Sequence, residues 1–466
     1  MISVQNHLLR LSGSKLLFFG ICLSFLFACG GAKKVIQPTL PSVSQQDGKA
    51  KVDTIKWVED SSAPAPIESD EVASNDGEAT STMDDGPEVP NSDKLEEYNI
   101  SVLFPFYSNA YNPENDRSRK KSKRAVQLYG GMQLAINKLE REGAKMKFNV
   151  FDTQGNTGTT HDLLTRGDIY SSDVIFGPFR SDNLKIGASI AQEIKKPFIS
   201  PMNPSDKITA NNPFFVQVKP SLEAHCQAIT AHVLESFEPE QVVIVARNKV
   251  GEKERLKIFQ EALGFHLKGK GEQKFREYLV TDYGNEFDNM DFTNYIVEGV
   301  PTVFVVPSWS SESFINNVLR KIRLVKLENE VTVYGMPQWK NFERVSYDDY
   351  EVLNLHVSSD NQLDRTKTNI QNFARVYFDK FGEMPTEDAY YGYDMTLYMG
   401  RMLIKHGSQF QTQIDAEPFV GLSTGFKFES IYDLSEDDFE TAPIKYIENR
   451  HVDILHFKEF RFQLVE

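Results

Sequence analysis

Two short polar loops carry the side chains in this sequence that are best suited to hold a small molecule. The loop Gly177–Ser181 follows the apolar run Val174–Phe176, and the loop Ser200–Ser205 follows the apolar pair Phe198-Ile199. Hydroxyl, amide and guanidinium groups in these loops can form directional hydrogen bonds with a ligand. They form no catalytic constellation, so the chemistry that they predict is binding.

One strand–helix–strand unit between Asp173 and Ser205 must position both loops. Apolar residues recur at roughly helical spacing from Leu184 to Ile194, and Pro197 ends that helix before the second extended run. A crossover of this length suits parallel strands. Because parallel strands end at the same edge of a sheet, where open α/β folds bind ligands, we expect the two loops to form adjacent walls of a pocket.

The sequence begins with features of a secretory signal. Arg10 and Lys15 precede an uncharged apolar run that is too short to span a bilayer comfortably, so we interpret residues 1–28 as a signal peptide. Leu26 to Gly30 resembles the lipobox of bacterial lipoproteins, which implies lipidation of Cys29. The alternative is an ordinary signal with an incidental cysteine. Because Gly30, not Asp, follows Cys29, we favour a periplasm-facing location on the outer membrane.

Residues 29–97 resemble a tether. From Glu59 to Glu97 there are thirteen acidic residues and one lysine, a net charge of −12 against −15 for the whole sequence. Such a segment is too poor in apolar residues to offset its ordering entropy, so we expect it to be disordered. The remaining chain is nearly neutral, and its charge gives no reason to expect nucleic-acid binding.

Cysteines, histidines and known catalytic motifs give no indication of a metal, a cofactor or an enzyme. Of Cys22, Cys29 and Cys226, one lies in the signal and one is the expected anchor, so no intramolecular disulfide can form. We interpret Cys226 as a core residue, and two neighbouring histidines alone are weak evidence for a metal. The sequence has no G-x-S-x-G, H-E-x-x-H, C-x-x-C or P-loop motif.

Six stretches of the sequence resemble the periplasmic binding fold type I, the leucine/isoleucine/valine-binding-protein-like family, in their order and spacing. They are LFPF (103–106), YGGMQLAINKLEREG (129–143), FNVFDTQGN (148–156), DVIFGPFRSDN (173–183), IKKPFISPMNPSD (194–206) and PFFVQVKPS (213–221). The resemblance implies an α/β fold with two doubly wound lobes, a hinge and an inter-lobe cleft. It also implies a substrate-binding lipoprotein of an ABC transporter and amino acid transport.

The length of the chain after the tether agrees with two lobes, because about 370 residues exceed a typical single core. We expect the first lobe to comprise about 98–220 and about 360–420. The second lobe would comprise about 221–359 and about 421–466. Within the first lobe we expect a helix that opens at Tyr129.

The resemblance also suggests which residues meet a ligand. Ser181 matches the serine of a Gly-Pro-x-x-Ser loop that contacts the ligand's carboxylate or ammonium end in amino-acid binders. Met202, Asn203 and Pro204 replace the usual Ser-Ala-Thr, which puts recognition of a free α-amino acid in doubt. A packing role is the alternative for each candidate. The candidates are Phe106, Gly177, Phe179, Arg180, Ser181, Ser200, Met202, Asn203, Arg247, Ser308, Trp309 and Trp339.

A basic run precedes the expected helix, with six cations among the eight residues Arg117–Arg124. It can be a solvated polar loop, an electrostatic collar for an anionic ligand or partner, or a surface that attracts the acidic tether. The sequence leaves these three interpretations open.

Two functional classes remain open. In the first, the protein captures an amino-acid-like molecule, a peptide or a cell-wall fragment between its lobes for a permease, transporter or sensor. In the second, it is a ligand-free interaction protein that regulates peptidoglycan synthesis, through a peptidoglycan synthase, or envelope assembly. Tyr334–Trp339 and Asn449–Ile454 resemble the envelope-lipoprotein branch of this fold, which is often associated with peptidoglycan-binding modules.

Overall fold

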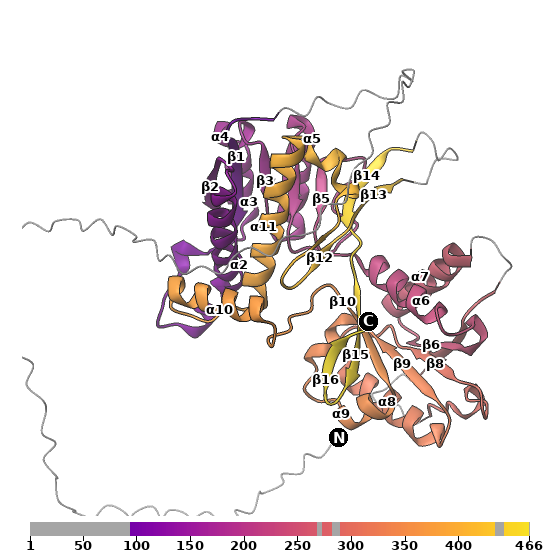
Figure 1. Cartoon of the computed structure of the whole chain (residues 1–466). Helices are drawn as coiled ribbons and strands as arrows, with labels where there is room; N and C mark the ends of the chain where they lie inside the picture. The colour runs from indigo at the N-terminus through magenta and orange to yellow at the C-terminus, as the bar shows by residue number, and fades with distance from the viewer. Residues whose placement is uncertain (1–93, 268–272, 282–288, 434–441, 466) are drawn as a thin grey trace, which may run out of the picture. The chain divides into compact units, whose positions relative to one another are not determined.

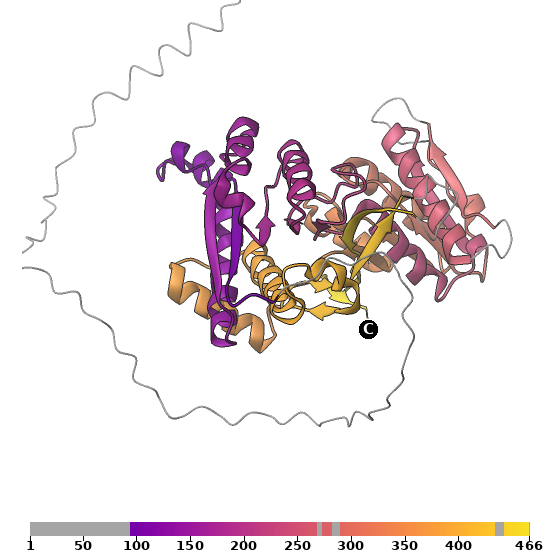
Figure 2. The same ribbon diagram turned by 90° about the horizontal axis from the view of Figure 1, so that it is seen from above.

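The computed structural model describes residues 94–267, 273–281, 289–433 and 442–465. Within these ranges the strands form two seven-stranded sheets, each covered by helices, and a small two-stranded sheet (Figure 1; Figure 2). The expected signal peptide, Cys29 and the acidic tether up to residue 93 lie outside the described residues. No helix in the described ranges is long and apolar enough to cross a membrane.

The first sheet has the strand order β13-β14-β5-β4-β3-β1-β2 and is parallel except for β13. Its strands are β1 (Tyr98–Phe104), β2 (Met146–Asp152), β3 (Val174–Phe176), β4 (Phe198–Ser200), β5 (Phe215–Gln217), β13 (Phe428–Tyr432) and β14 (Ile444–Asn449). Every residue of β3, β4 and β5 is buried, because helices cover both faces of this sheet.

Two layers of helices cover the first sheet. Successive strand residues point to opposite faces, so Val102 packs with α2 and α11 while Leu103 packs with α3 and α5. A Cβ on Gly131 of α2 would lie 1.8 Å from the Ala389 carbonyl of α11, so glycine permits this close crossing. The helices are α2 (Asp116–Arg141), α3 (Thr157–Leu164), α4 (Gly167–Tyr170), α5 (Ser181–Ile194), α10 (Thr368–Phe381) and α11 (Glu387–His406), with the short η2 (Ser108–Ala110), η6 (Phe410–Thr412) and η7 (Ile414–Ala416).

Helix α2 corrects one expectation from the sequence. It begins at Asp116, so the basic run forms its first turns and is not a polar loop. The side chain of Asn115 caps the helix by accepting hydrogen bonds from the backbone N–H groups of Arg117 and Ser118, at 3.0 and 3.3 Å. Ser122 and Ala125 are buried, so the side of α2 that faces the core extends into the N-terminal part of this helix. This buried side is hard to recognise in the sequence, because cations occupy most of the neighbouring positions.

The second sheet has the strand order β16-β15-β10-β9-β8-β6-β7, and only β15 runs opposite to the other strands, antiparallel to both β10 and β16. Its strands are β6 (Val242–Arg247), β7 (Arg276–Val280), β8 (Thr302–Val305), β9 (Val331–Gly335), β10 (Leu355–Ser359), β15 (Asp453–Lys458) and β16 (Arg461–Leu464). Its helices are α6 (Leu222–Leu234), α7 (Val250–Leu267), α8 (Glu312–Lys326) and α9 (Tyr347–Val352), with the short η3 (Pro239–Gln241), η4 (Thr293–Tyr295) and η5 (Pro337–Asn341).

The described chain passes between the two large sheets three times, after β5, after β10 and after β14. The sequence placed about 421–466 in the second lobe, and the structure differs there. Strand β14 pairs in parallel with β5, with Glu448 opposite Gln217, so β13 and β14 extend the first sheet. Only β15 and β16 join the second sheet, as the two yellow hairpins of Figure 1 show.

Asp394 of α11 holds the segment that leads into the small sheet of β11 (Phe419–Val420) and β12 (Gly425–Phe426). Its carboxylate accepts hydrogen bonds from the backbone N–H of Leu422 at 2.7 Å, and from the N–H and hydroxyl of Ser423 at 2.8 Å each. Burial raises the pKa of Asp394 to about 6. The position of Leu422 and Ser423 therefore depends on the fully buried carboxylate of Asp394.

Asp394→Ala is expected to lower the free energy of unfolding by about 2–4 kcal/mol, because it leaves buried N–H groups without an acceptor. Urea unfolding at neutral pH measures this. Asp379→Ala, at an exposed position of α10, is the matched control. Equal unfolding midpoints for the two variants would show that Asp394 is not needed to hold the segment.

Candidate ligand-binding site

Strand pairing brings the two predicted loops together. Parallel strands β3 and β4 pair Ile175 with Phe198 and Phe176 with Ile199, so the loops that follow leave the same edge of the sheet. The side-chain amide of Asn203 donates a hydrogen bond of 2.9 Å to the hydroxyl of Ser181. The loops are therefore neighbours, as parallel pairing predicts.

Each of the two loops contributes one apolar side chain, Phe179 or Met202, that packs onto the core next to Phe106. Phe106, Phe179 and Met202 are partly buried, and all three pack against the core that contains Phe104. The ring centroids of Phe104 and Phe179 lie 4.9 Å apart. Gly177 has a φ of +87°, and a Cβ there would lie 2.3 Å from a backbone carbonyl of β1, so its role is to let the loop pass close to that strand.

The polar candidates of the first sheet divide into exposed and buried groups. Arg180 and Ser181 are exposed, and the Arg180 guanidinium donates to the carbonyl of Gly155 at 3.3 Å. Ser200 is fully buried, and its hydroxyl has no hydrogen-bond partner among the described residues. Of the predicted residues, Arg180, Ser181 and Asn203 are therefore the ones that can offer polar groups to a ligand.

Ser200 belongs to a buried polar row under these loops, whose other members, Gln217 and Asn183, were not singled out from the sequence. Ser200 lies opposite Gln217 in the sheet, and Asn183 faces inward from α5. The side-chain amides of Gln217 and Asn183 have no hydrogen-bond partner in the described part of the chain. Unpaired buried amides are costly. The only sign of this buried row in the sequence is that β4, β5 and α5 each have one polar residue at a position where the pattern is otherwise apolar.

Asp152 fixes the connection between β1 and α2, which carries Phe106. Its carboxylate accepts backbone N–H hydrogen bonds from Phe106 at 2.9 Å, Tyr107 at 3.1 Å and Ser108 at 2.7 Å. It also accepts from the Ser108 hydroxyl and the Gln154 N–H, at 2.7 and 2.8 Å. Burial alone would raise the pKa of Asp152, but these hydrogen bonds outweigh it and lower the pKa.

The second-sheet candidates come together around a glutamate that the sequence did not single out. Glu252 of α7 accepts hydrogen bonds from the backbone N–H and the Nε of Arg247, each at 2.7 Å. It also accepts from the Ser308 hydroxyl at 2.9 Å. The indole N–H of Trp339 donates to the carbonyl of Ser308 at 2.9 Å. Arg247, Ser308 and Trp339 are therefore linked at the carboxyl edge of this sheet.

This network changes the roles expected for two of the candidates. Trp339 is fully buried against Gly335 and offers no ring face to a ligand. Arg247 forms an ion pair with Glu252 and lies over the ring of Phe314, so its charge is already compensated. Trp309 is partly buried and packs against the second core. Trp339 is part of the support for this edge, not a stacking surface.

A second group missed by the sequence lies where the chain passes between the sheets. The Lys219 ammonium and the Asp360 carboxylate form an ion pair of 2.6 Å between two crossover segments. Lys340 donates hydrogen bonds to the Ser359 hydroxyl at 2.6 Å and to the Asn361 carbonyl at 3.0 Å. A hollow of about 280 Å³ lies here. It is lined by Pro337, Gln338, Lys340, Asn341, Asp360, Asn361, Gln362, Leu363, Glu387 and Phe462.

Asp152→Asn is expected to lower the free energy of unfolding by about 2 kcal/mol at pH 7, because an amide cannot accept all of these hydrogen bonds. Since the folded-state pKa of Asp152 lies below its ordinary value, wild-type protein loses this advantage as pH falls through the folded-state pKa.

Urea unfolding at pH 7 and at successively lower pH measures this difference. Asp162→Asn, on the exposed side of α3, serves as the control. A stability difference between wild type and Asp152→Asn that does not change with pH would contradict an ionised Asp152 as the acceptor.

Known structures share this fold. An ABC transporter substrate-binding protein from Desulfitobacterium hafniense in complex with Leu is 16% identical, with a TM-score of 0.50, over 79% of this chain and 100% of that chain. A branched chain amino acid ABC transporter periplasmic ligand-binding protein from Burkholderia xenovorans LB400 is 13% identical, with a TM-score of 0.52, over 79% and 94%. No curated protein matches the sequence.

Both large sheets, their helices and the three crossovers agree with the two-lobed periplasmic binding protein type I fold. We call the first sheet with its helices the first lobe, and the second sheet with its helices the second lobe. Residues 127–408 match the family described as the receptor family ligand binding region. This match spans 282 of 466 residues (408 − 127 + 1). The chain therefore belongs to the receptor ligand-binding region family.

Proposed function

We propose that this protein captures a small polar molecule between its two lobes and presents it to a transporter or sensor. The observation that carries this proposal is the hydrogen bond between Asn203 and Ser181, which joins two polar loops at the carboxyl edge of a parallel sheet. The ligand class is amino-acid-like, a peptide or a cell-wall fragment.

The chemistry of the first-lobe wall supports a ligand with one anionic end and some apolar surface. The Arg180 guanidinium can pair with a carboxylate or phosphate, while Ser181 and Asn203 can exchange their mutual hydrogen bond for ligand contacts. Phe179 and Met202 supply apolar contact beside these groups. Pro204 offers no N–H, which argues against the hydrogen-bonding pattern used for a free α-amino acid.

The connections between the lobes support a hinge. Three separate crossovers join the sheets, and the Lys219–Asp360 ion pair links the first two. Lobes joined in this way can rotate about a few residues and close over a ligand. Closure would give a permease or sensor a surface that the empty protein lacks.

We also propose that the chain is a lipoprotein, anchored through Cys29 to the periplasmic face of the outer membrane. The lipobox-like sequence Leu26 to Gly30 supports this. Each buried CH₂ of an acyl chain contributes about 0.8 kcal/mol, so several chains would hold the protein firmly. Cys29 lies outside the described residues. The acidic stretch that follows it would give the lobes reach from the membrane.

The second lobe provides an observation that favours the alternative function. Its carboxyl-edge groups are largely satisfied internally, since Glu252 pairs with Arg247 and Trp339 is buried. A lobe with few free polar groups suits a protein that acts by contact with a partner, such as a peptidoglycan synthase, without a ligand. Detecting or failing to detect a bound molecule separates the two functions.

Native mass spectrometry of protein purified without denaturation is expected to reveal a bound small molecule. The double variant Ser181→Ala/Asn203→Ala should retain at least about tenfold less of it, because two polar contacts are lost. Asn372→Ala, at an exposed position of α10, is the control and should retain the ligand. A spectrum without added mass, and no thermal shift with amino acids, peptides or muropeptides, would favour the interaction protein.

Cys29→Ala is expected to move the protein from the membrane fraction to the soluble fraction, because the thiol that would carry the lipid is gone. Cell fractionation followed by immunoblotting measures this. Cys22→Ala, within the expected signal, is the control and should leave the protein membrane-bound. Membrane association of Cys29→Ala equal to that of wild type would show that the anchor lies elsewhere.

A further inference from the structure

The first turns of α2 concentrate positive charge. Six cations lie between Arg117 and Arg124, and Asp116 pairs with two of them, Arg119 at 3.4 Å and Lys120 at 2.7 Å. Lys123 forms no ion pair with any residue that the structure describes. Cations in the first turn of a helix, here Arg117 and Arg119, are unfavourable, because the helix dipole is positive there. A bound anion would relieve this repulsion.

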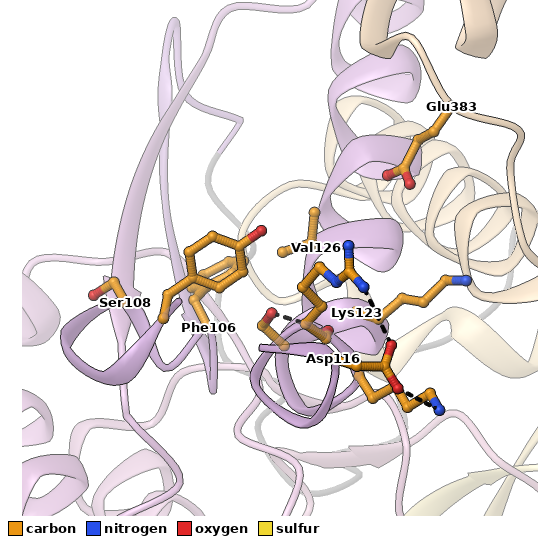
Figure 3. A pocket seen from close by; sticks show the side chains of 10 residues that line it. Phe106, Ser108, Asp116, Lys123, Val126 and Glu383 are labelled. Atoms are coloured by element: carbon orange, nitrogen blue, oxygen red, sulfur yellow. Dashed lines mark hydrogen bonds and ion pairs between the residues drawn. The ribbon is translucent and has the colours of Figure 1, made fainter. Parts of the chain in front are cut away.

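A hollow of about 590 Å³ lies beside these cations (Figure 3). Its apolar part is formed by Phe106, Tyr111 and Val126, and the last two are 50% and 44% exposed. Arg119, Lys120 and Lys123 line the same hollow. Its volume lies in the range that holds a drug-sized molecule. Apolar and cationic side chains therefore line the same hollow.

This hollow is separate from the loops of the proposed ligand site. Its walls come from the connection after β1, from α2 and from Glu383 in the turn between α10 and α11. None of the residues of Gly177–Ser181 or Ser200–Ser205 lines it. Of the predicted ligand-binding residues only Phe106 is shared, and Asp152 holds that residue by its backbone.

Charge compensation within the hollow is incomplete. The lining contains three cations and two carboxylates, Asp116 and Glu383. Asp116 is used by Arg119 and Lys120, and Glu383 accepts a hydrogen bond of 2.8 Å from the side-chain amide of Gln127. Lys123 is therefore the cation best placed to pair with an incoming anion.

We propose that this hollow is a second binding site, for an amphipathic organic anion with one carboxylate on an apolar body. The carboxylate pairs with Lys123 and Arg119, and the apolar body covers Tyr111 and Val126. Exposed apolar side chains beside a lining with more cations than carboxylates match both halves of such a molecule. The proposal is independent of ligand capture between the lobes.

Isothermal titration calorimetry of the full secreted chain carrying Cys29→Ala, in detergent-free buffer, tests this proposal with three probes. Decanoate carries both features, acetate only the charge, and decanol only the apolar body. We expect decanoate to bind at least about tenfold more tightly than either of the others. Its affinity should fall as salt is added, because exposed charges are screened.

Two variants locate the site. Lys123→Gln removes the unpaired charge and Val126→Asp places a carboxylate on the apolar part, and each should weaken decanoate binding about tenfold or more. Lys185→Gln, at an exposed position of α5, is the charge control, and circular dichroism verifies folding. Ser181→Ala/Asn203→Ala should bind decanoate like the parent chain, which separates this site from the proposed cleft.

Equal affinity for decanoate and decanol would overturn the role of the cations. Equal weakening by Lys185→Gln and Lys123→Gln would overturn the assignment to this hollow. Failure of the parent Cys29→Ala chain to bind decanoate at millimolar concentration would overturn the proposal as a whole.

Discussion

The parallel pairing of β3 with β4 is the constraint on which the first-lobe site depends. It requires both strands to end at one edge, and it makes Gly177–Ser181 and Ser200–Ser205 neighbours whatever their loop sequences are. Burial of both faces fixes the register, since a slip of one residue would turn Phe198 from one core to the other. The polar loops are thus held in place by the buried apolar residues of the two strands.

Charges at the crossovers form the second constraint. Burial alone would raise the pKa of Asp360, but the neighbouring basic groups, chiefly Lys219 together with His225 and Lys340, outweigh it and lower the pKa to about 2. Burial lowers the pKa of the neighbouring His225 to about 4, so the imidazole is neutral near pH 7. A partly buried ion pair adds little net stability, because desolvation offsets much of the attraction between its charges. We infer that the main effect of the Lys219–Asp360 pair is to fix the geometry of the two crossovers that it links.

The sequence predicted the fold well because its signals were local. Pro197 and the short apolar runs defined the strand–helix–strand unit, and the Asp-Thr strand end contained Asp152. It failed where a residue acts through distant partners. Asp360 and Trp339 find their partners Lys219 and Ser308 only after folding, and cations along α2 concealed its inward face. The β13–β14 hairpin was misplaced because pairing of β14 with β5 joins residues about 230 positions apart.

Distance measurement between spin labels on the two lobes tests ligand capture most directly. Labels at Asp182→Cys in the first lobe and Asn248→Cys in the second occupy exposed positions, and the native Cys226 is buried. We expect a shorter and narrower distance distribution in protein that retains its ligand than in protein stripped by unfolding and refolding. Identical distributions, with a bound molecule verified by mass, would contradict closure of the lobes on a ligand.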